Sequence, residues 1–290
     1  MRLGCIDIGS NTTRLLVADC DGRRLQVVRQ ERSFTRIANE LFEHGALSEA
    51  KIAEVVAVVA AQVASAHRER VSEIRAVGTE AIRRAANGAE LVRAITAATG
   101  LEIDVLSGEQ EARLAFIGAA AALEEPVVGE LGVVDVGGGS SELVVGRPPS
   151  QIGWWASIGL GSATITHIHL HHDPPQPAEI VAARADIARA LAPLIVPEPA
   201  VAVAVGGSAT CVALLAGGVL DPGALADTLG LLAAEPSAEV ALRHAIDPRR
   251  ARLLPAGLLV LAGVAEAFGT TLGVGRGGIR EGVLLEAAGR

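Results

Sequence analysis

Apolar and polar positions along the 290-residue chain repeat with two different periods. Residues 4–17 (GCIDIGSNTTRLLV) alternate apolar residues, turn on Gly, Ser and Asn, and then resume an apolar run, which predicts two strands joined by a tight turn. Longer stretches rich in Ala, Val and Leu have helical spacing instead. Helices are expected at 48–67, 90–99, 107–123 and 258–268, and a strand at 101–106. Strands that alternate with helices in this way predict an α/β fold.

The strand–turn–strand segment occurs twice in the chain. Residues 132–145 (GVVDVGGGSSELVV) repeat it, with Asp135 in the place of Asp7. The same offset of 128 residues relates AVGTEA at 76–81 to AVGGSA at 204–209, and each of these predicts a strand, a small-residue turn and a helix. Two matches in one register indicate a gene duplication, because a single short match can arise by chance.

The duplication divides the chain into two expected domains of the same architecture, with a cleft between them that can hold a ligand. The break falls at Glu124-Glu125-Pro126, which ends the preceding helix. We therefore expect a first domain at 1–124 and a second at 125–290. The pattern leaves open whether the last helix packs back on the first domain.

The balance of charges narrows the class of ligand. A net charge of −8 argues against general binding to nucleic acid or to an anionic membrane. Lys51 is the only lysine among 25 basic residues, so the chain has no GK[ST] sequence and no Walker-type phosphate loop. An anionic ligand must therefore be held by arginine, backbone N–H groups, helix N-termini or a metal ion.

Apolar runs and cysteines indicate the compartment. No apolar run extends uninterrupted over the roughly 18 residues of a membrane span, and no secretory leader is apparent. Cys5, Cys20 and Cys211 have no metal-binding spacing, and their odd number favours reduced thiols. We therefore expect a cytoplasmic protein.

An acidic residue ends the first strand of each repeat. We expect Asp7 and Asp135 to face each other across the cleft, where their carboxylates suit Mg²⁺ or Mn²⁺. The glycine-rich turns that follow offer clustered N–H groups and hydroxyls to phosphate. The residues expected to bind phosphate in this way are Gly9, Ser10, Asn11, Thr12, Gly137, Gly138, Gly139 and Ser140, together with Gly207 and Ser208 of the other repeated element. Arg14 follows the first turn, and its charge can face either phosphate or solvent.

Six segments occur in a fixed order: DIGSNTTRLLV, VGTEAIRRAANG, SGEQEARLAF, VVDVGGGSSELVVG, VAVGGSATCVA and GGIREGVLLE. In this order they resemble the exopolyphosphatase/guanosine pentaphosphate phosphohydrolase (Ppx/GppA) family, whose members have the actin-like ATPase (ribonuclease H-like) superfold. The resemblance extends over essentially all 290 residues. Because the chain stops just after IREGVLLE, it resembles the short, two-domain form of the family.

The resemblance implies an activity and roles for individual residues. It implies hydrolysis of terminal phosphates of inorganic polyphosphate or guanosine pentaphosphate, with Mg²⁺ or Mn²⁺, by a homodimer. Glu111 matches the family glutamate that activates the attacking water, and Glu142 matches an acid that assists the metal or the water. Arg83 and Arg280 fall on family positions, where guanidinium groups suit phosphoryl oxygens. Arg84 is expected to be a solvated helix charge.

Three features depart from the family pattern or lie outside it. Gln110 stands where a glutamate is usual, and it can still form a capping box with Ser107. Thr164 stands where many relatives have arginine, so no arginine contact carries over to that position. The histidine-rich HIHLHHD segment at 167–173 has no third ligand nearby, and a surface helix is expected there rather than a metal site.

Two other functions are compatible with the same residues. A sugar or acetate kinase of this superfold would transfer phosphate from ATP to an acceptor instead of water. A sensor would bind guanosine alarmones without hydrolysing them. Phosphate release without an acceptor distinguishes the hydrolase from the kinase, and binding without release indicates the sensor. The spaced cysteines of an iron–sulfur activator are missing.

Overall fold

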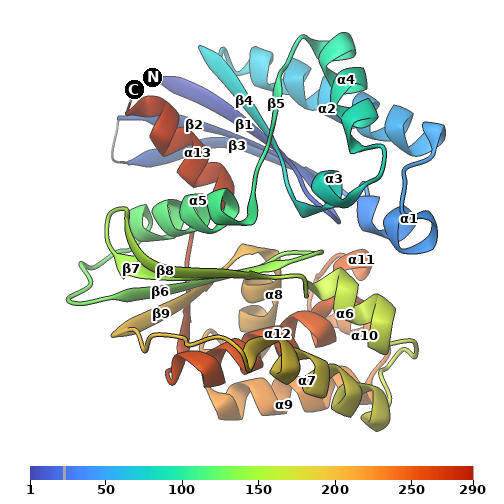
Figure 1. The fold of residues 1–290 in the computed structure, drawn as a ribbon, viewed down its shortest axis with the longest axis vertical. Coiled ribbons are helices and arrows are strands. Elements are labelled where there is room, and N and C mark those ends of the chain that lie inside the picture. Colours follow the sequence, from blue (N-terminus) through green and yellow to red (C-terminus); the bar gives the residue numbers. More distant parts are fainter. Residues whose placement is uncertain (22–23, 290) are drawn as a thin grey trace. The chain divides into compact units, whose positions relative to one another are not determined.

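A computed structural model of the protein describes residues 1–21 and 24–289 and divides the chain into two compact units. The first comprises Met1–Ala122 and the chain from Gly277 onward, and the second comprises Leu123–Arg276. Each unit contains one five-stranded mixed sheet with helices packed on it (Figure 1). The last helix therefore belongs to the first unit, and the chain leaves that unit once and returns to it.

The first unit is built on strands in the order β3-β2-β1-β4-β5, in which β1 is antiparallel to β2 and parallel to β4. Its strands are β1 (Arg2–Ile8), β2 (Thr13–Cys20), β3 (Leu25–Ser33), β4 (Glu73–Gly78) and β5 (Ile103–Val105). Its helices are α1 (Ile37–His44), α2 (Glu49–Arg68), α3 (Glu80–Arg84), α4 (Gly88–Thr99), α5 (Gly108–Ala121) and α13 (Ile279–Ala288).

Both faces of this sheet are covered by helices. Ile6 and Ile8 of β1 pack in one cluster with Val55 of α2 and Leu91 of α4. The alternate residues of the same strands belong to a second cluster on the other face, which includes Leu284 of α13. Because successive side chains of a strand point to opposite faces, a strand buried on both sides needs a continuous apolar sequence, as residues 3–6 of β1 have.

The close approach of α5 and α13 depends on glycines. A Cβ atom on Gly282 would lie 2.1 Å from the carbonyl oxygen of Leu114, and one on Gly118 would lie 2.1 Å from that of Gly278. Arg113 of α5 also pairs with Glu286 of α13 through Nη2 and Oε2 at 3.0 Å. The glycines of the GGIREG segment therefore have a packing role of their own.

The second unit repeats this arrangement in the order β8-β7-β6-β9-β10. Its strands are β6 (Leu131–Val136), β7 (Ser141–Arg147), β8 (Gln151–Ile158), β9 (Val201–Val205) and β10 (Leu272–Val274). Its helices are α6 (Ser162–His169), α7 (Pro177–Leu191), α8 (Gly206–Ala216), α9 (Pro222–Ala234), α10 (Ser237–Arg243), α11 (Pro248–Ala251) and α12 (Leu254–Phe268).

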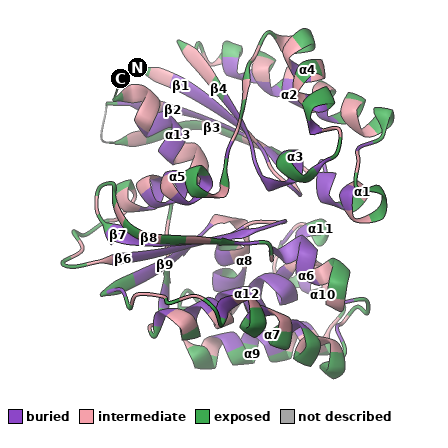
Figure 2. Ribbon diagram, viewed as in Figure 1, coloured by how far each residue is buried: buried purple, intermediate pink, exposed green. Residues whose placement is uncertain are grey.

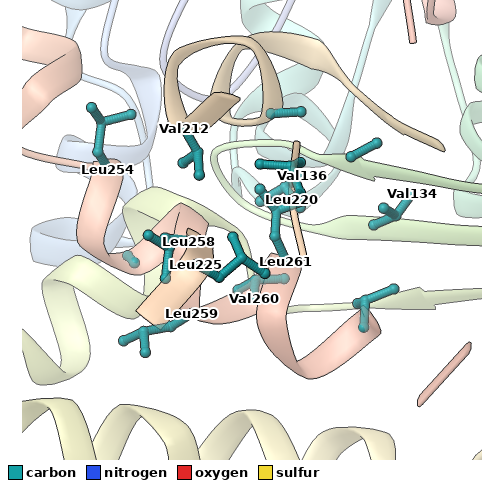
Figure 3. Packing of buried hydrophobic residues seen from close by; sticks show 14 of the residues in the cluster. Val134, Val136, Val212, Leu220, Leu225, Leu254, Leu258, Leu259, Val260 and Leu261 are labelled. Atoms are coloured by element: carbon teal, nitrogen blue, oxygen red, sulfur yellow. The ribbon is translucent and has the colours of Figure 1, made fainter. Parts of the chain in front are cut away.

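The core of the second unit is centred on α12, which is buried along most of its length (Figure 2). Leu258 and Leu261 of this helix pack in one cluster with Val136 of β6 and Val212 of α8 (Figure 3). With aromatic residues at 2% of the chain, the core is filled mostly by Leu, Val, Ile and Ala, with Phe268 among its buried residues. Their branched aliphatic side chains interdigitate closely enough to fix how α8 and α12 lie against the sheet.

The helix and strand predictions agree with the structure in type and differ at some ends. The helix expected at 258–268 begins at Leu254, because Pro255 lies in the first turn, where a missing N–H is tolerated. The strand expected at 101–106 is reduced to Ile103–Val105. In the described part of the chain, α2 alone is long and apolar enough to span a membrane by length and composition. Val55 and Val59 of this helix pack in the core cluster of the first unit.

Candidate phosphate-binding site

The two repeated strand–turn–strand segments close with the same hydrogen bond. The N–H of Gly9 donates to the carbonyl of Thr12 at 3.0 Å, and that of Gly137 donates to the carbonyl of Ser140 at 3.0 Å. The strands that flank the turns also have the same register. Asp7 lies opposite Arg14, whereas Asp135 lies opposite Glu142, so the acid of the first unit faces a cation and that of the second faces another acid.

In the second unit, the beginning of α6 binds all three glycine carbonyls of the turn. The carbonyl of Gly137 accepts from the N–H and the hydroxyl of Ser162 at 2.9 and 3.1 Å. The carbonyl of Gly138 accepts from the N–H of Ala163 at 2.8 Å, and that of Gly139 accepts from the N–H of Gly161 at 3.1 Å. The buried Thr164 adds a hydrogen bond from its hydroxyl to the same Gly139 carbonyl, at 3.0 Å.

The beginning of α1 does the same for the first turn. Here the N–H of Arg36 donates to the carbonyl of Asn11 at 3.0 Å, and the N–H of Ala38 donates to that of Ser10 at 2.8 Å. Since Ser10 and Asn11 correspond to Gly138 and Gly139, the duplication includes the helix start behind each turn. The internal repeats found in the sequence did not include this third element. The residues of α1 and α6 share no motif, and the two helices are not separated by the 128 residues that separate the other repeated segments.

The positions of these carbonyls fix the direction of the N–H groups. In a trans peptide the C=O of one residue and the N–H of the next point in opposite directions. With their carbonyls bound to α6, the N–H groups of Gly138, Gly139 and Ser140 point away from that helix, and those of Asn11 and Thr12 likewise point away from α1. Among residues 1–21 and 24–289 these five groups have no hydrogen-bond partner, so each turn presents the donors that an anion requires.

Asp7 lies at the end of β1 beside the first turn. Its Oδ1 is buried and has no hydrogen-bond partner in the described residues. Burial raises the pKa of this carboxyl, while the charges of Arg14 and Arg280 lower it. Arg280 of α13 is thus close enough to Asp7 for the two side chains to act on one ligand. A buried carboxylate oxygen without a partner suits a hard cation or a water bound to one.

Asp135 and Glu142 lie side by side on β6 and β7. Glu142 is buried and its Oε1 accepts a hydrogen bond from the hydroxyl of Ser157 at 2.9 Å. Oδ1 of Asp135 would be only 2.5 Å from a Cβ atom on Gly206, whose φ is +84°. Glycine is therefore required at 206 both for the backbone conformation and for the approach of the carboxylate.

Glu111 lies in the first turn of α5, which begins with the capping box predicted for Ser107 and Gln110. The side chain of Glu111 is 3% exposed, and its Oε1 accepts a hydrogen bond from Nη1 of Arg83 at 2.6 Å. The same guanidinium also contacts the carbonyl of Leu106. The structure thus brings together two residues that the sequence analysis assigned to different roles, and Arg83 orients the Glu111 carboxylate.

Arg250 of α11, in the second unit, is a residue that the sequence analysis missed. It is 8% exposed, and its Nε is buried without a hydrogen-bond partner in the described residues. Its guanidinium lies against Gly207, where a Cβ atom would be 1.7 Å from Nη1. Next to it, the hydroxyl of Ser208 donates to the carbonyl of Val136 at 3.3 Å. A buried cation beside the first turn of α8 suits an anionic ligand, but RRA at 249–251 gives no local sign of this position.

The surface helix expected at the histidine-rich segment covers only its first residues, because α6 ends at His169. His167 and His171 therefore do not lie on one helical face. His169 pairs with Asp186 at 3.0 Å and His172 with Glu179 at 2.8 Å. Within residues 1–21 and 24–289, no three His, Cys, Asp or Glu side chains gather closely enough to hold a metal ion.

Two equivalent sheets, each with a glycine turn and an acid at the same strand end, define a duplicated α/β protein of the actin-like ATPase fold. Solved structures agree over 99% of the chain. A Ppx/GppA family member of Aquifex aeolicus is 30% identical with a TM-score of 0.84, and the match covers 97% of that protein. An exopolyphosphatase from Cytophaga hutchinsonii is 22% identical with a TM-score of 0.86, which supports the fold alone.

Sequence comparison identifies the family. The Ppx/GppA phosphatase family matches residues 16–290, and the chain belongs to this family. It is 34% identical over 186 residues to an uncharacterised protein of Streptomyces coelicolor, a match over 63% of this chain and 55% of that protein. It is 29% identical over 212 residues to exopolyphosphatase 1 of Mycobacterium tuberculosis, over 72% of this chain and 59% of the relative. The chain thus matches little more than half the length of these curated relatives.

Proposed function

We propose that the protein is a phosphatase that hydrolyses terminal phosphoanhydride bonds of inorganic polyphosphate, of guanosine pentaphosphate, or of both. The observation that carries the proposal is the pair of glycine turns whose carbonyls are bound from behind and whose N–H groups are left for an anion. Exopolyphosphatases among the relatives support the substrate class. Arg14, Arg280 and Arg250 would add the positive charge that a polyanion requires in a chain with one lysine.

Glu111 is the proposed general base. Phosphoryl transfer to water needs positioning and charge neutralisation, together with a group that orients the attacking water and accepts its proton. Glu111 is suited to this task because its carboxylate is buried and is held by Arg83. A carboxylate held in one orientation is already placed to accept the proton of the attacking water, whereas a freely rotating carboxylate would be in that position only part of the time.

Asp135 and Glu142, which are neighbours on β6 and β7, would hold Mg²⁺ or Mn²⁺, and in the first unit the unpaired oxygen of Asp7 would offer a ligand to such an ion. Their hard oxygen donors fit such an ion. When bound, the ion would neutralise charge on the phosphate oxygens. The proposed assembly is the homodimer implied by the family resemblance, and measurement of the molar mass in solution tests it.

The proposed function is tested by phosphate release from a panel of polyphosphates of different length, guanosine pentaphosphate and ATP, with Mg²⁺ present. The expected result is stoichiometric release of phosphate without an acceptor, with polyphosphate or guanosine pentaphosphate preferred over ATP. Faster turnover of ATP in the presence of a sugar or acetate would indicate a kinase instead. Tight binding of guanosine pentaphosphate without phosphate release would indicate a sensor.

A further inference from the structure

Glu80 is a buried acid with no role in the mechanism proposed above. It is the first residue of α3 and is 6% exposed. Its Oε2 accepts a hydrogen bond from the hydroxyl of Ser10 at 3.2 Å, and its Oε1 accepts one from Nη1 of Arg84 at 2.8 Å. Burying a carboxylate costs several kcal/mol unless it is paired and hydrogen-bonded, so these two contacts determine where Glu80 can lie.

The contact with Glu80 determines what Ser10 can do. An ionised carboxylate only accepts hydrogen bonds, and a serine hydroxyl has one proton to donate. While that proton is directed to Glu80, Ser10 cannot donate its hydroxyl to a phosphate. The carbonyl of Ser10 is bound as well, by the N–H of Ala38. Ser10 is therefore held at two points, which leaves the next N–H, that of Asn11, directed away from α1.

Arg84 neutralises the charge of Glu80 in this arrangement. The sequence analysis treated it as a solvated charge, and its side chain is half exposed, but its guanidinium pairs with Glu80 one helical turn earlier. An unneutralised acid next to the first turn would repel a phosphate bound there. Arg84 offsets that charge, so that Glu80 can hold Ser10 without opposing an anion.

No equivalent contact occurs in the second unit, all of whose residues the structure describes. The position that corresponds to Glu80 is Ser208, whose hydroxyl donates to Val136, and the position that corresponds to Ser10 is Gly138, which has no side chain. The two turns share a backbone conformation and a support at the helix start, but among the described residues only the first turn is also held by a buried carboxylate, that of Glu80. The duplicated halves therefore differ in how each phosphate-binding turn is fixed.

We propose that Glu80 is a positioning residue for the first glycine turn: it fixes Ser10, and Arg84 cancels its charge. The proposal rests on the proposed function, because the first turn is one of its two anion-binding elements. It predicts that Ser10 and Glu80 act as a unit. It also predicts that loss of Arg84 alone is more harmful to anion binding than loss of Arg84 and Glu80 together.

The test compares Ser10→Ala, Glu80→Gln and the double variant in phosphate release from short polyphosphate, and in calorimetric binding of pyrophosphate. Each single change is expected to raise KM and the dissociation constant of pyrophosphate by roughly tenfold, with a smaller effect on kcat, and the double variant should resemble the singles. Arg84→Gln is expected to weaken pyrophosphate binding, and addition of Glu80→Gln should restore part of it. Asp19→Asn removes the 2.8 Å ion pair with Arg2 at the other end of the same sheet and should leave both constants unchanged.

Two results would overturn the proposal. One is a double variant in which the increases in KM caused by Ser10→Ala and by Glu80→Gln multiply. Multiplied effects would show that the two residues act independently and not as a unit. The other is a loss of thermal stability with unchanged KM and pyrophosphate affinity, which would make Glu80 a purely structural residue. Because pyrophosphate binding is measured separately, it tests Glu80 even if no substrate of the panel is hydrolysed. Absence of hydrolysis by the wild-type protein would count against the proposed function alone.

Discussion

Gly161, which begins the segment behind the second glycine turn, offers a direct test of how that turn is held. A Cβ atom at this position would lie 2.4 Å from both the carbon and the oxygen of the Gly138 carbonyl, and 2.7 Å from the N–H nitrogen of Gly139. These distances are about 1 Å shorter than an ordinary carbon contact of roughly 3.5 Å. The atoms it meets are backbone atoms, which cannot rotate away as a flexible side chain does. Gly161→Ala must therefore displace the turn, the beginning of α6, or both.

The expected cost is about 1 to 3 kcal/mol in the free energy of unfolding, the range for overpacking a well-packed site. A displaced turn should also lose the common direction of its N–H groups, so KM for polyphosphate should rise by roughly tenfold or more. Gly159→Ala is the matched control. A Cβ atom there has nothing within 4 Å, so stability should stay the same or rise by about 0.5 kcal/mol, with unchanged kinetics.

Urea denaturation and phosphate release, measured on the same preparations of the two variants, provide the comparison. The reasoning about the turn is refuted if Gly161→Ala loses stability but keeps the wild-type KM, because the turn would then bind its ligand in spite of the displacement. Equal stability of the Gly161→Ala and Gly159→Ala variants would refute the packing argument itself.

Three further predictions address the proposed base, the metal and pH. Glu111→Gln should lower kcat by roughly 10²- to 10⁴-fold while KM changes little, with the exposed Glu109→Gln as control; an unaltered rate in folded protein would move the base elsewhere, with Glu142 the next candidate. EDTA should abolish phosphate release, and added Mg²⁺ or Mn²⁺ should restore it; full activity in chelator would contradict the roles of Asp7 and Asp135. Burial raises the pKa of Glu179, but hydrogen bonds from the His172 ring and three backbone N–H groups outweigh this and lower the pKa to about 2. Wild-type protein should therefore be more stable than Glu179→Gln above about pH 4.5, and the difference should disappear as the pH falls towards 2; a pH-independent difference in urea denaturation would contradict this.

Local features of the fold could be predicted because short segments encode them. The capping box at Ser107, the left-handed Gly100 that ends α4, and the two strand–turn–strand segments each depend on residues a few positions apart. The periodicity of apolar residues also predicted correctly whether nearly every expected element is a helix or a strand. The duplication was visible for the same reason, since the two copies of each motif preserve the same local chemistry.

The contacts that make up the candidate site depended on the tertiary structure. Arg83 and Glu111 are 28 residues apart, Ser10 and Glu80 are 70 apart, and α13 reaches α5 through Arg113 and Glu286, 173 residues apart. No periodicity relates such positions. Each can meet its partner only after strands and helices have packed, when the alternation of side chains across a sheet decides which group faces which. The sequence determined the two glycine turns and their acids. Packing decided which residues hold each turn, which guanidinium orients Glu111, and that the guanidinium of Arg250 is buried against Gly207.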